Sequence, residues 1–183
     1  MVLISMLRGV NLGPHRRMRM EPLRAMYESI GFLEPQTFIQ SGNVIFKTKE
    51  KDLAKITAKI EKAIERECGF HSDVVLRTPA DLQKVIAKNP FASRSDIHPG
   101  KLLVTFLVGD PGPEAAARIS AIRAEAEELH LLGRELYVYY RDGAGRSKLT
   151  PPIMERALKI SGTARNWNTV QKLLDMATAL EAS

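Results

Sequence analysis

The sequence predicts an α+β protein of two ferredoxin-like halves in tandem, and three observations lead to that class. Short apolar runs alternate with amphipathic helical stretches, a Gly-containing hairpin follows the first helix of each half, and the order β-α-β-β-α-β recurs in rough form after residue 100. The 183 residues are 44% hydrophobic and 26% charged, which is typical of folded chains and excludes disordered or collagen-like classes.

The first half is predicted from its apolar spacing and its turn residues. The expected elements are a buried strand over Val2–Leu7, a helix over 20–31, strands over 36–41 and 44–47, a helix over 53–69 and a strand over 73–77. The two middle strands flank Gly42-Asn43, a pair suited to a two-residue type II′ turn. Thr78 and Pro79 predict the N-cap and first position of a further helix.

The second half repeats this pattern after a linker. Residues 89–100 contain two prolines and no periodicity, so we expect them to separate an N-terminal half, 1–90, from a C-terminal half, 101–183. The expected elements that follow are a strand over 102–108, a helix carrying Ile119, Ile122, Ala126 and Leu129, a hairpin of 129–132 and 135–141, a helix over 151–159 and a terminal helix. The last strand of this half is expected near 161–164, where the apolar pattern is faint.

Several classes of site and location are excluded by composition. The single cysteine, Cys68, excludes an intrachain disulfide framework and multi-cysteine metal sites. The four histidines are scattered without helical pair spacing, so no metal and no cofactor is expected. No apolar run approaches the roughly 20 residues that cross a bilayer, and the first residues do not resemble a signal peptide. We therefore expect a soluble cytoplasmic protein with no membrane partner.

Positive charge is concentrated in two windows. Lys and Arg total 27 against 21 Asp and Glu, a net charge of +6. Residues 8–24 hold five arginines and one glutamate, and residues 141–172 hold seven cations and two acids. Segregated positive charge suits anionic ligands such as phosphates, nucleotides or nucleic acid, although solvated helix faces also carry such charge.

No standard catalytic signature is present. The chain has no G-x-S-x-G elbow, no Walker A loop and no G-x-G-x-x-G placed between a strand and a helix. Cys68 and His71 are three residues apart, but without an acidic or cysteine partner their proximity is interpreted as chance. Whether the protein is an enzyme therefore stays open.

Polar loop residues of the first half form the first set of candidate binding residues. Strands one and two of a β-α-β-β-α-β unit are parallel, so the loop after the first strand and the following hairpin emerge at one end of the sheet. The candidates are Arg8, Asn11, Gly13, Gln40, Ser41 and Asn43. Their amides, hydroxyl and guanidinium could bind an oxyanion or a planar polar group, or they could only form tight turns.

A second set of candidates lies in the second half. These residues are Arg146, Ser147, Lys148, Arg165, Asn166 and Asn168. The last three open the terminal helix, where unpaired N–H groups favour anions, and Asn168 is its expected N-cap. The only tryptophan, Trp167, is interpreted as a core anchor.

The strings LRGVNLG, TFIQSGNVIF, NPF, GRSKLT and TARNWNTVQKLL, in this order, resemble the bacterial family called domain of unknown function 1697. The resemblance runs from residue 7 to residue 174 and implies a cytoplasmic bacterial protein of two α+β subdomains, without an assigned activity. It marks both candidate sets, together with Gly42 and Trp167, as family motif positions. The basic run Arg16–Arg19 departs from the family pattern, which often has glycine or lysine after the first loop.

Three functions remain in view. The first is binding of a phosphorylated small molecule or nucleotide at the polar loops of the two halves, with His15 or Asp142 as candidate bases if a reaction occurs. The second is binding of the RNA backbone, which the scarcity of strand aromatics makes the less favoured hypothesis. The third is a partner-binding or dimerising module without catalysis. Oligomeric state is not predicted.

Overall fold

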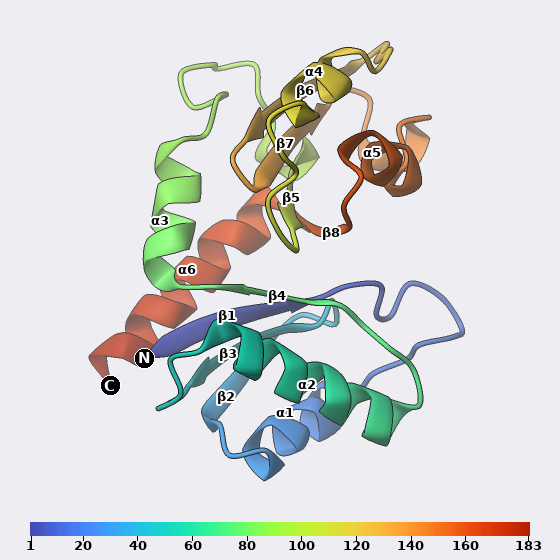
Figure 1. Cartoon of the computed structure of the whole chain (residues 1–183). Coiled ribbons are helices and arrows are strands. Elements are labelled where there is room, and N and C mark those ends of the chain that lie inside the picture. The colour runs from blue at the N-terminus through green and yellow to red at the C-terminus, as the bar shows by residue number, and fades with distance from the viewer. The chain divides into compact units, whose positions relative to one another are not determined.

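The computed structural model describes residues 1–183 and contains six α-helices and two four-stranded antiparallel sheets, which confirms the predicted α+β class. The chain forms two compact units, one of residues 1–84 together with 172–183 and the other of residues 85–171. Each unit contains one of the sheets (Figure 1).

The first unit is built on a sheet in the strand order β2-β3-β1-β4. Its elements are β1 (Val2–Leu7), α1 (Met20–Ser29), β2 (Leu33–Phe38), β3 (Asn43–Lys47), α2 (Leu53–Cys68) and β4 (Val74–Arg77), and α3 (Pro79–Ala87) follows. In the central register, Ile4 of β1 pairs with Ile45 of β3 and with Arg77 of β4. Because β1 and β2 both run antiparallel to β3, they run parallel to each other.

Local sequence explains why α2 forms where it does. The Asp52 carboxylate accepts hydrogen bonds from the backbone N–H groups of Ala54 (3.0 Å) and Lys55 (3.2 Å), which caps the helix. Gly69 ends it in the left-handed conformation at φ +74°. The apolar spacing predicts one buried stripe of Leu53, Ile56, Ile60, Ala63 and Ile64, and all of these except the exposed Leu53 are buried.

Helices α1 and α2 cover one face of the first sheet (Figure 1). The rings of Tyr27, Phe32 and Phe46 pack there, with centroid separations between 4.5 and 5.9 Å. The Tyr27 hydroxyl is fully buried and lies 2.8 Å from Ser5 Oγ, so its polar atom has a partner inside the core. Burial raises the pKa of this tyrosine above its usual value.

The second unit repeats the arrangement of the first. Its elements are η1 (Pro99–Lys101), β5 (Leu102–Leu107), α4 (Ala115–Ser120), β6 (Glu127–Leu132), β7 (Glu135–Tyr140), η2 (Ala144–Arg146), α5 (Pro151–Leu158) and β8 (Gly162–Asn166), and α6 (Trp167–Ala182) begins in it. The strand order β6-β7-β5-β8 matches that of the first sheet position by position. The two halves are therefore similar in topology.

Both faces of the second sheet are buried. On one face, Leu107, Val138 and the residues of α4 and α5 form a continuous core. On the other, the Tyr137 hydroxyl donates to the Val85 carbonyl at 2.7 Å, and the Phe91 ring packs 5.9 Å from that of Tyr139.

Three expectations about element detail are wrong. Phe38 pairs with Asn43, so the hairpin turn consists of the four residues 39–42 and not of Gly42-Asn43. Helix α4 ends at Ser120, and Leu129 lies in β6, because pairing along the whole of β7 holds residues 127–132 extended. The last strand of the second half runs to Asn166, two residues beyond the expected segment.

Candidate functional site

The loop after β1 and the turn between β2 and β3 lie against each other, as the strand directions predict. The backbone N–H of Leu7 donates to the carbonyl of Gly42 at 2.9 Å. The side-chain amide of Asn11 donates to the carbonyl of Gln40 at 2.7 Å. The structure thus brings these parts of the first candidate set together at one edge of the first sheet.

Asn11 uses its amide to hold the loop closed. Its Nδ2 donates to the Met18 carbonyl at 2.9 Å, in addition to Gln40, and its Oδ1 accepts from the Met18 N–H at 2.7 Å. The backbone of Asn11 is left-handed, at φ +56°, a conformation that asparagine adopts more readily than most residues. Both amide N–H groups are therefore engaged inside the protein.

The turn between β2 and β3 is fixed by Gly42 and Asn43. A Cβ on Gly42 would lie 2.6 Å from Val10 Cγ2 and 2.8 Å from Leu7 Cβ, and φ is +72° there, so only glycine fits without strain. Asn43 is fully buried and donates to Ser41 Oγ at 2.7 Å and to the Phe38 carbonyl at 3.2 Å. These motif positions shape the turn.

The remaining residues of the first set are more exposed. Arg8 is half-buried, and its guanidinium lies 3.6 Å from the Asp73 carboxylate. Gly13 and Gln40 are exposed, and no atom lies within 4 Å of the position a Gly13 Cβ would take. Gln40 is the exposed polar side chain of this set, whereas Arg8, Asn11 and Ser41 are half-buried.

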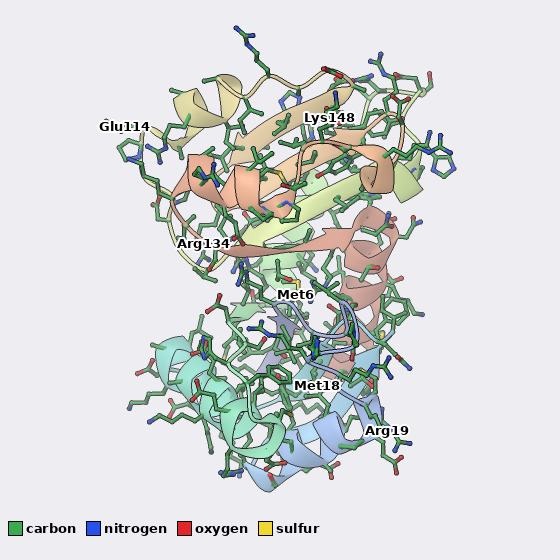
Figure 2. All side chains as sticks on the ribbon, turned by 90° about the vertical axis from the view of Figure 1, so that its right-hand side faces the viewer. Met6, Met18, Arg19, Glu114, Arg134 and Lys148 are labelled. Atoms are coloured by element: carbon green, nitrogen blue, oxygen red, sulfur yellow. The ribbon has the colours of Figure 1, made fainter.

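In the second unit, the loop after β7 forms one wall of a pocket of about 250 Å³. The charged side chains that line it are Arg123, Arg146, Lys148, Glu125, Glu127 and Asp142. The candidates Arg146, Ser147 and Lys148 thus meet in one place, and Lys148 is almost fully exposed (Figure 2).

The acidic side of this pocket was missed by sequence reasoning. Ser147 Oγ donates a short hydrogen bond to the Glu127 carboxylate, and this bond is the largest cause that lowers the pKa of Glu127. Lys148 Nζ lies 3.9 Å from the Glu125 carboxylate. Segment 123–127 was predicted as helix, and nothing in a helical pattern places it against residues 142–149.

Arg165 lies outside the pocket, in β8, where it pairs with Val104 of β5. Its side chain is 6% exposed and donates to Thr163 Oγ1 (2.6 Å) and to the Ala164 carbonyl (2.8 Å). Desolvation lowers its pKa to about 10. Arg77 of β4 is buried at the matching place in the first sheet, paired with Ile4.

Asn166, and not Asn168, caps the terminal helix. Helix α6 begins at Trp167, so Asn168 lies inside its first turn and is not the N-cap. The Asn166 Oδ1 accepts from the Asn168 N–H at 3.0 Å, and its Nδ2 donates to the Gly100 carbonyl at 2.9 Å. Neither asparagine lines the pocket.

Cys68 and His71 lie at the end of α2 and in the loop that follows. The expectation that no acidic partner is near is wrong, because His71 Nδ1 lies 2.9 Å from Glu65 and Nε2 lies 3.1 Å from Asp73. The hydrogen bond to Asp73, followed by that to Glu65, raises the pKa of His71. Desolvation raises the pKa of the Cys68 thiol, so this thiol is not activated as a nucleophile.

None of the helices combines the length and the apolar composition that a membrane crossing requires.

Comparison with known proteins gives a family and a fold. A family model described as a protein of unknown function, DUF1697, matches residues 1–137. The structure of a conserved bacterial protein, SP0830 from Streptococcus pneumoniae, superposes with a TM-score of 0.73 at 20% sequence identity, covering 97% of this chain and 98% of that one. No match was found among curated proteins.

Proposed function

The chain belongs to the DUF1697 family, and on that premise we propose that it binds a phosphorylated small molecule, a sugar phosphate or a nucleotide, in the pocket of its second unit. The observation that carries the proposal is the convergence of Arg123, Arg146 and Lys148 around one cavity of about 250 Å³.

The cations suit the phosphate end of such a ligand. Guanidinium groups bind phosphate oxygens through paired N–H donors, and an ammonium adds a compact point charge. Arg146 and Lys148 are both exposed, on one short loop, so they can reorient toward a ligand without breaking the core. Arg123 comes from the other segment that lines the pocket.

The carboxylates of the pocket suit the end of the ligand that lies away from the phosphate. Glu125, Glu127 and Asp142 are hydrogen-bond acceptors when ionised, so they favour a ligand part that carries donors. Sugar hydroxyls and the exocyclic amino group of a base provide such donors at a distance from the phosphate, whereas inorganic phosphate or polyphosphate has no separate group of this kind. A mixed lining therefore favours a sugar phosphate or nucleotide over a bare polyanion.

The test is ligand binding measured by thermal shift and calorimetry on the full chain, with nucleotides, sugar phosphates and inorganic phosphate as probes. A ligand present at 100 times its Kd stabilises the unit that binds it by roughly 2.7 kcal/mol, which raises Tm by several degrees. We expect R146A and K148A each to weaken binding by about tenfold or more, because each removes a charge-assisted contact.

Arg134→Ala is the matched control. Arg134 is an exposed arginine of the same unit, in the turn between β6 and β7, and Figure 2 places it well away from Lys148. Arg165→Ala is unsuitable, since it would remove a buried side chain and test folding. No shift with any small phosphorylated compound, or equal loss in R134A and R146A, would contradict the proposal.

Binding of a nucleic-acid backbone is the second candidate, favoured by one observation. Arg16, Arg17 and Arg19 are all exposed on the loop that follows β1. Backbone contacts of this kind release counterions, so affinity for a short RNA would fall steeply with salt. R16A combined with R17A would reduce such binding and leave binding at the pocket of the second unit unchanged.

We propose three finer assignments as well. Each half is ferredoxin-like, supported by the β-α-β-β-α-β order and by the matching strand orders. The functional halves are residues 1–90 and 101–183, with 89–100 between them. The protein acts in the cytoplasm, in keeping with the absence of a membrane-spanning helix.

A further inference from the structure

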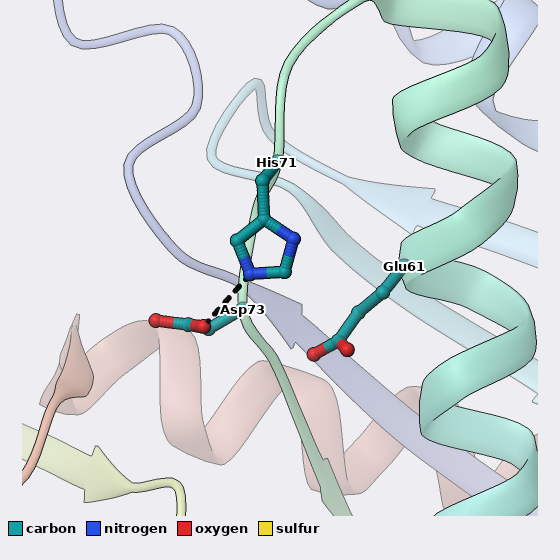
Figure 3. Close-up of side chains that lie close together, drawn as sticks. All are labelled: Glu61, His71 and Asp73. Atoms are coloured by element: carbon teal, nitrogen blue, oxygen red, sulfur yellow. Dashed lines mark hydrogen bonds and ion pairs between the residues drawn. The ribbon is translucent and has the colours of Figure 1, made fainter.

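We infer that Glu61, His71 and Asp73 of the first unit form a binding site for a divalent transition-metal cation, with Zn²⁺ as the best-matched ion (Figure 3). This inference concerns a different unit from the proposed ligand pocket and does not depend on it. The spacing of histidine pairs in the sequence does not reveal this cluster, because it contains a single histidine.

The donor atoms converge from one helix and the short loop that follows it. Glu61 projects from α2, His71 from the loop after α2, and Asp73 stands directly before β4. One ligand atom from each lies within 4.8 Å of the others. Tetrahedral zinc, with bonds of about 2.0–2.2 Å, separates its ligand atoms by roughly 3.4 Å. The 3.1 Å between His71 Nε2 and Asp73 Oδ1 is already close to that separation.

The hydrogen bond on the far side of the ring orients the imidazole. His71 Nδ1 lies 2.9 Å from the Glu65 carboxylate, so the tautomer with its proton on Nδ1 donates to Glu65. In the neutral ring, the lone pair of Nε2 then faces the Asp73 carboxylate at 3.1 Å. A proton on Nε2 or a metal ion must lie between these two atoms, and a bound Zn²⁺ would take the place of that proton. A carboxylate behind the other ring nitrogen is the usual support of a zinc-bound histidine.

The local charge also favours a cation. Three carboxylates, those of Glu61, Glu65 and Asp73, surround the imidazole, and Arg8 is the cation paired with Asp73, at 3.6 Å. Glu61 is anchored by a hydrogen bond that it accepts from the Val74 N–H at 3.1 Å. One imidazole nitrogen with two carboxylate oxygens is a mixed set that suits zinc and leaves a coordination position open to water. Mg²⁺ and Ca²⁺ would not use the histidine.

The experiment is calorimetric titration of Zn²⁺ into full-length protein that has been treated with a chelator and desalted. We expect one Zn²⁺ per chain. We expect E61Q, D73N and H71Q to abolish binding or weaken it by more than a hundredfold, and E65Q to weaken it by about 10–100-fold, the range usual for a carboxylate that supports a ligating histidine. Co²⁺ added to the wild-type protein should give the visible absorption of a low-coordinate site.

Two matched controls separate this site from general attraction of cations. Glu67 lies on the same helix and is exposed, so E67Q should bind Zn²⁺ as the wild type does. His15, an exposed histidine of another loop, serves the same purpose as H15Q. The inference is overturned if the wild type binds no Zn²⁺, if H71Q binds it unchanged, or if E67Q loses as much affinity as E61Q. Phosphate-ligand binding should be the same with and without Zn²⁺, so failure of either proposal is distinguishable.

Discussion

Asn11 closes the loop after β1 with two hydrogen bonds to Met18 and connects that loop to the hairpin turn with one to Gln40. Asn11→Ala would leave those backbone groups without their partner and would place alanine in a left-handed conformation. We expect the first unit to lose about 2–4 kcal/mol of stability, measured by urea denaturation with hydrogen exchange as the local readout.

Leu12 provides the control for that substitution. Its side chain is 85% exposed, so L12A should change stability by less than about 0.5 kcal/mol. Equal effects of N11A and L12A would mean that the amide network contributes nothing to the fold.

The hydrogen bond from Ser147 to Glu127 is expected to make the stability of the second unit depend on pH. It lowers the folded-state pKa of Glu127, so its contribution to stability is present above the unfolded-state pKa and is lost as pH falls through the folded-state value. In Ser147→Ala, the pKa of Glu127 should rise toward the ordinary glutamate value, as followed by NMR titration of its side-chain carboxyl carbon. An unchanged pKa in S147A would show that backbone N–H groups alone lower it.

Glu128 is the internal reference for this titration. It neighbours Glu127 in β6, but its pKa is lowered mainly by Arg94, which donates to it at 2.5 Å. S147A should therefore leave the pKa of Glu128 where it is.

At the scale of elements, the hairpin between β2 and β3 depends on Gly42. Gly42→Ala combines a left-handed backbone with contacts shorter than any real Cβ tolerates, to side chains of Val10 and Leu7. We expect a loss of about 3 kcal/mol or more in the first unit, seen as faster amide exchange in β3.

Gly133 provides a control that separates the effect of the left-handed backbone from the effect of the close contacts. It also has positive φ, at +62°, in the turn between β6 and β7, but nothing lies within 4 Å of its Cβ position. G133A should therefore lower the stability of the second unit by about 1–2 kcal/mol, which is the cost of a left-handed backbone alone. A G42A variant no less stable than G133A would show that the loop and the hairpin turn can move apart without cost.

Elements with local signals were predicted well from the sequence, whereas elements that depend mainly on distant strand pairing were predicted only in part. Helix α2 follows from its apolar stripe and from Gly69. Strand β8, GTARN, has no apolar run, and its identity comes from pairing with β5, Phe106 opposite Thr163. Distant strand pairing also explains why the candidate site was only partly predicted. The sequence alone predicts Arg165 as a candidate anion-binding cation, but the pairing of β8 with β5 buries it. The sequence predicts segment 123–127 as helix, but the pairing of β6 with β7 makes its last residue part of a strand.

At the scale of the whole molecule, the first unit is discontinuous in sequence. Residues 172–183, from α6, belong to it although the second unit precedes them. Leu173 is fully buried, so Leu173→Ala should cost about 2–5 kcal/mol. Hydrogen exchange should accelerate mainly in β1–β4, since those strands share a unit with this residue.

Lys172 is the exposed neighbour and the control, and K172A should leave exchange unchanged. If L173A instead accelerates exchange only in β5–β8, residue 173 supports the second unit and the boundary within α6 lies further along the helix.

The discontinuity of the first unit also sets an order of events during biosynthesis. Residues 1–84 leave the ribosome well before residues 172–183, which complete their unit. At 5–20 residues per second, the incomplete unit waits about 4 to 18 seconds, far longer than a small domain needs to fold. During that interval the nascent chain lacks Leu173, Ala177 and Leu180, three side chains that are buried in the finished protein. Nascent first units are therefore the species on which a chaperone would act.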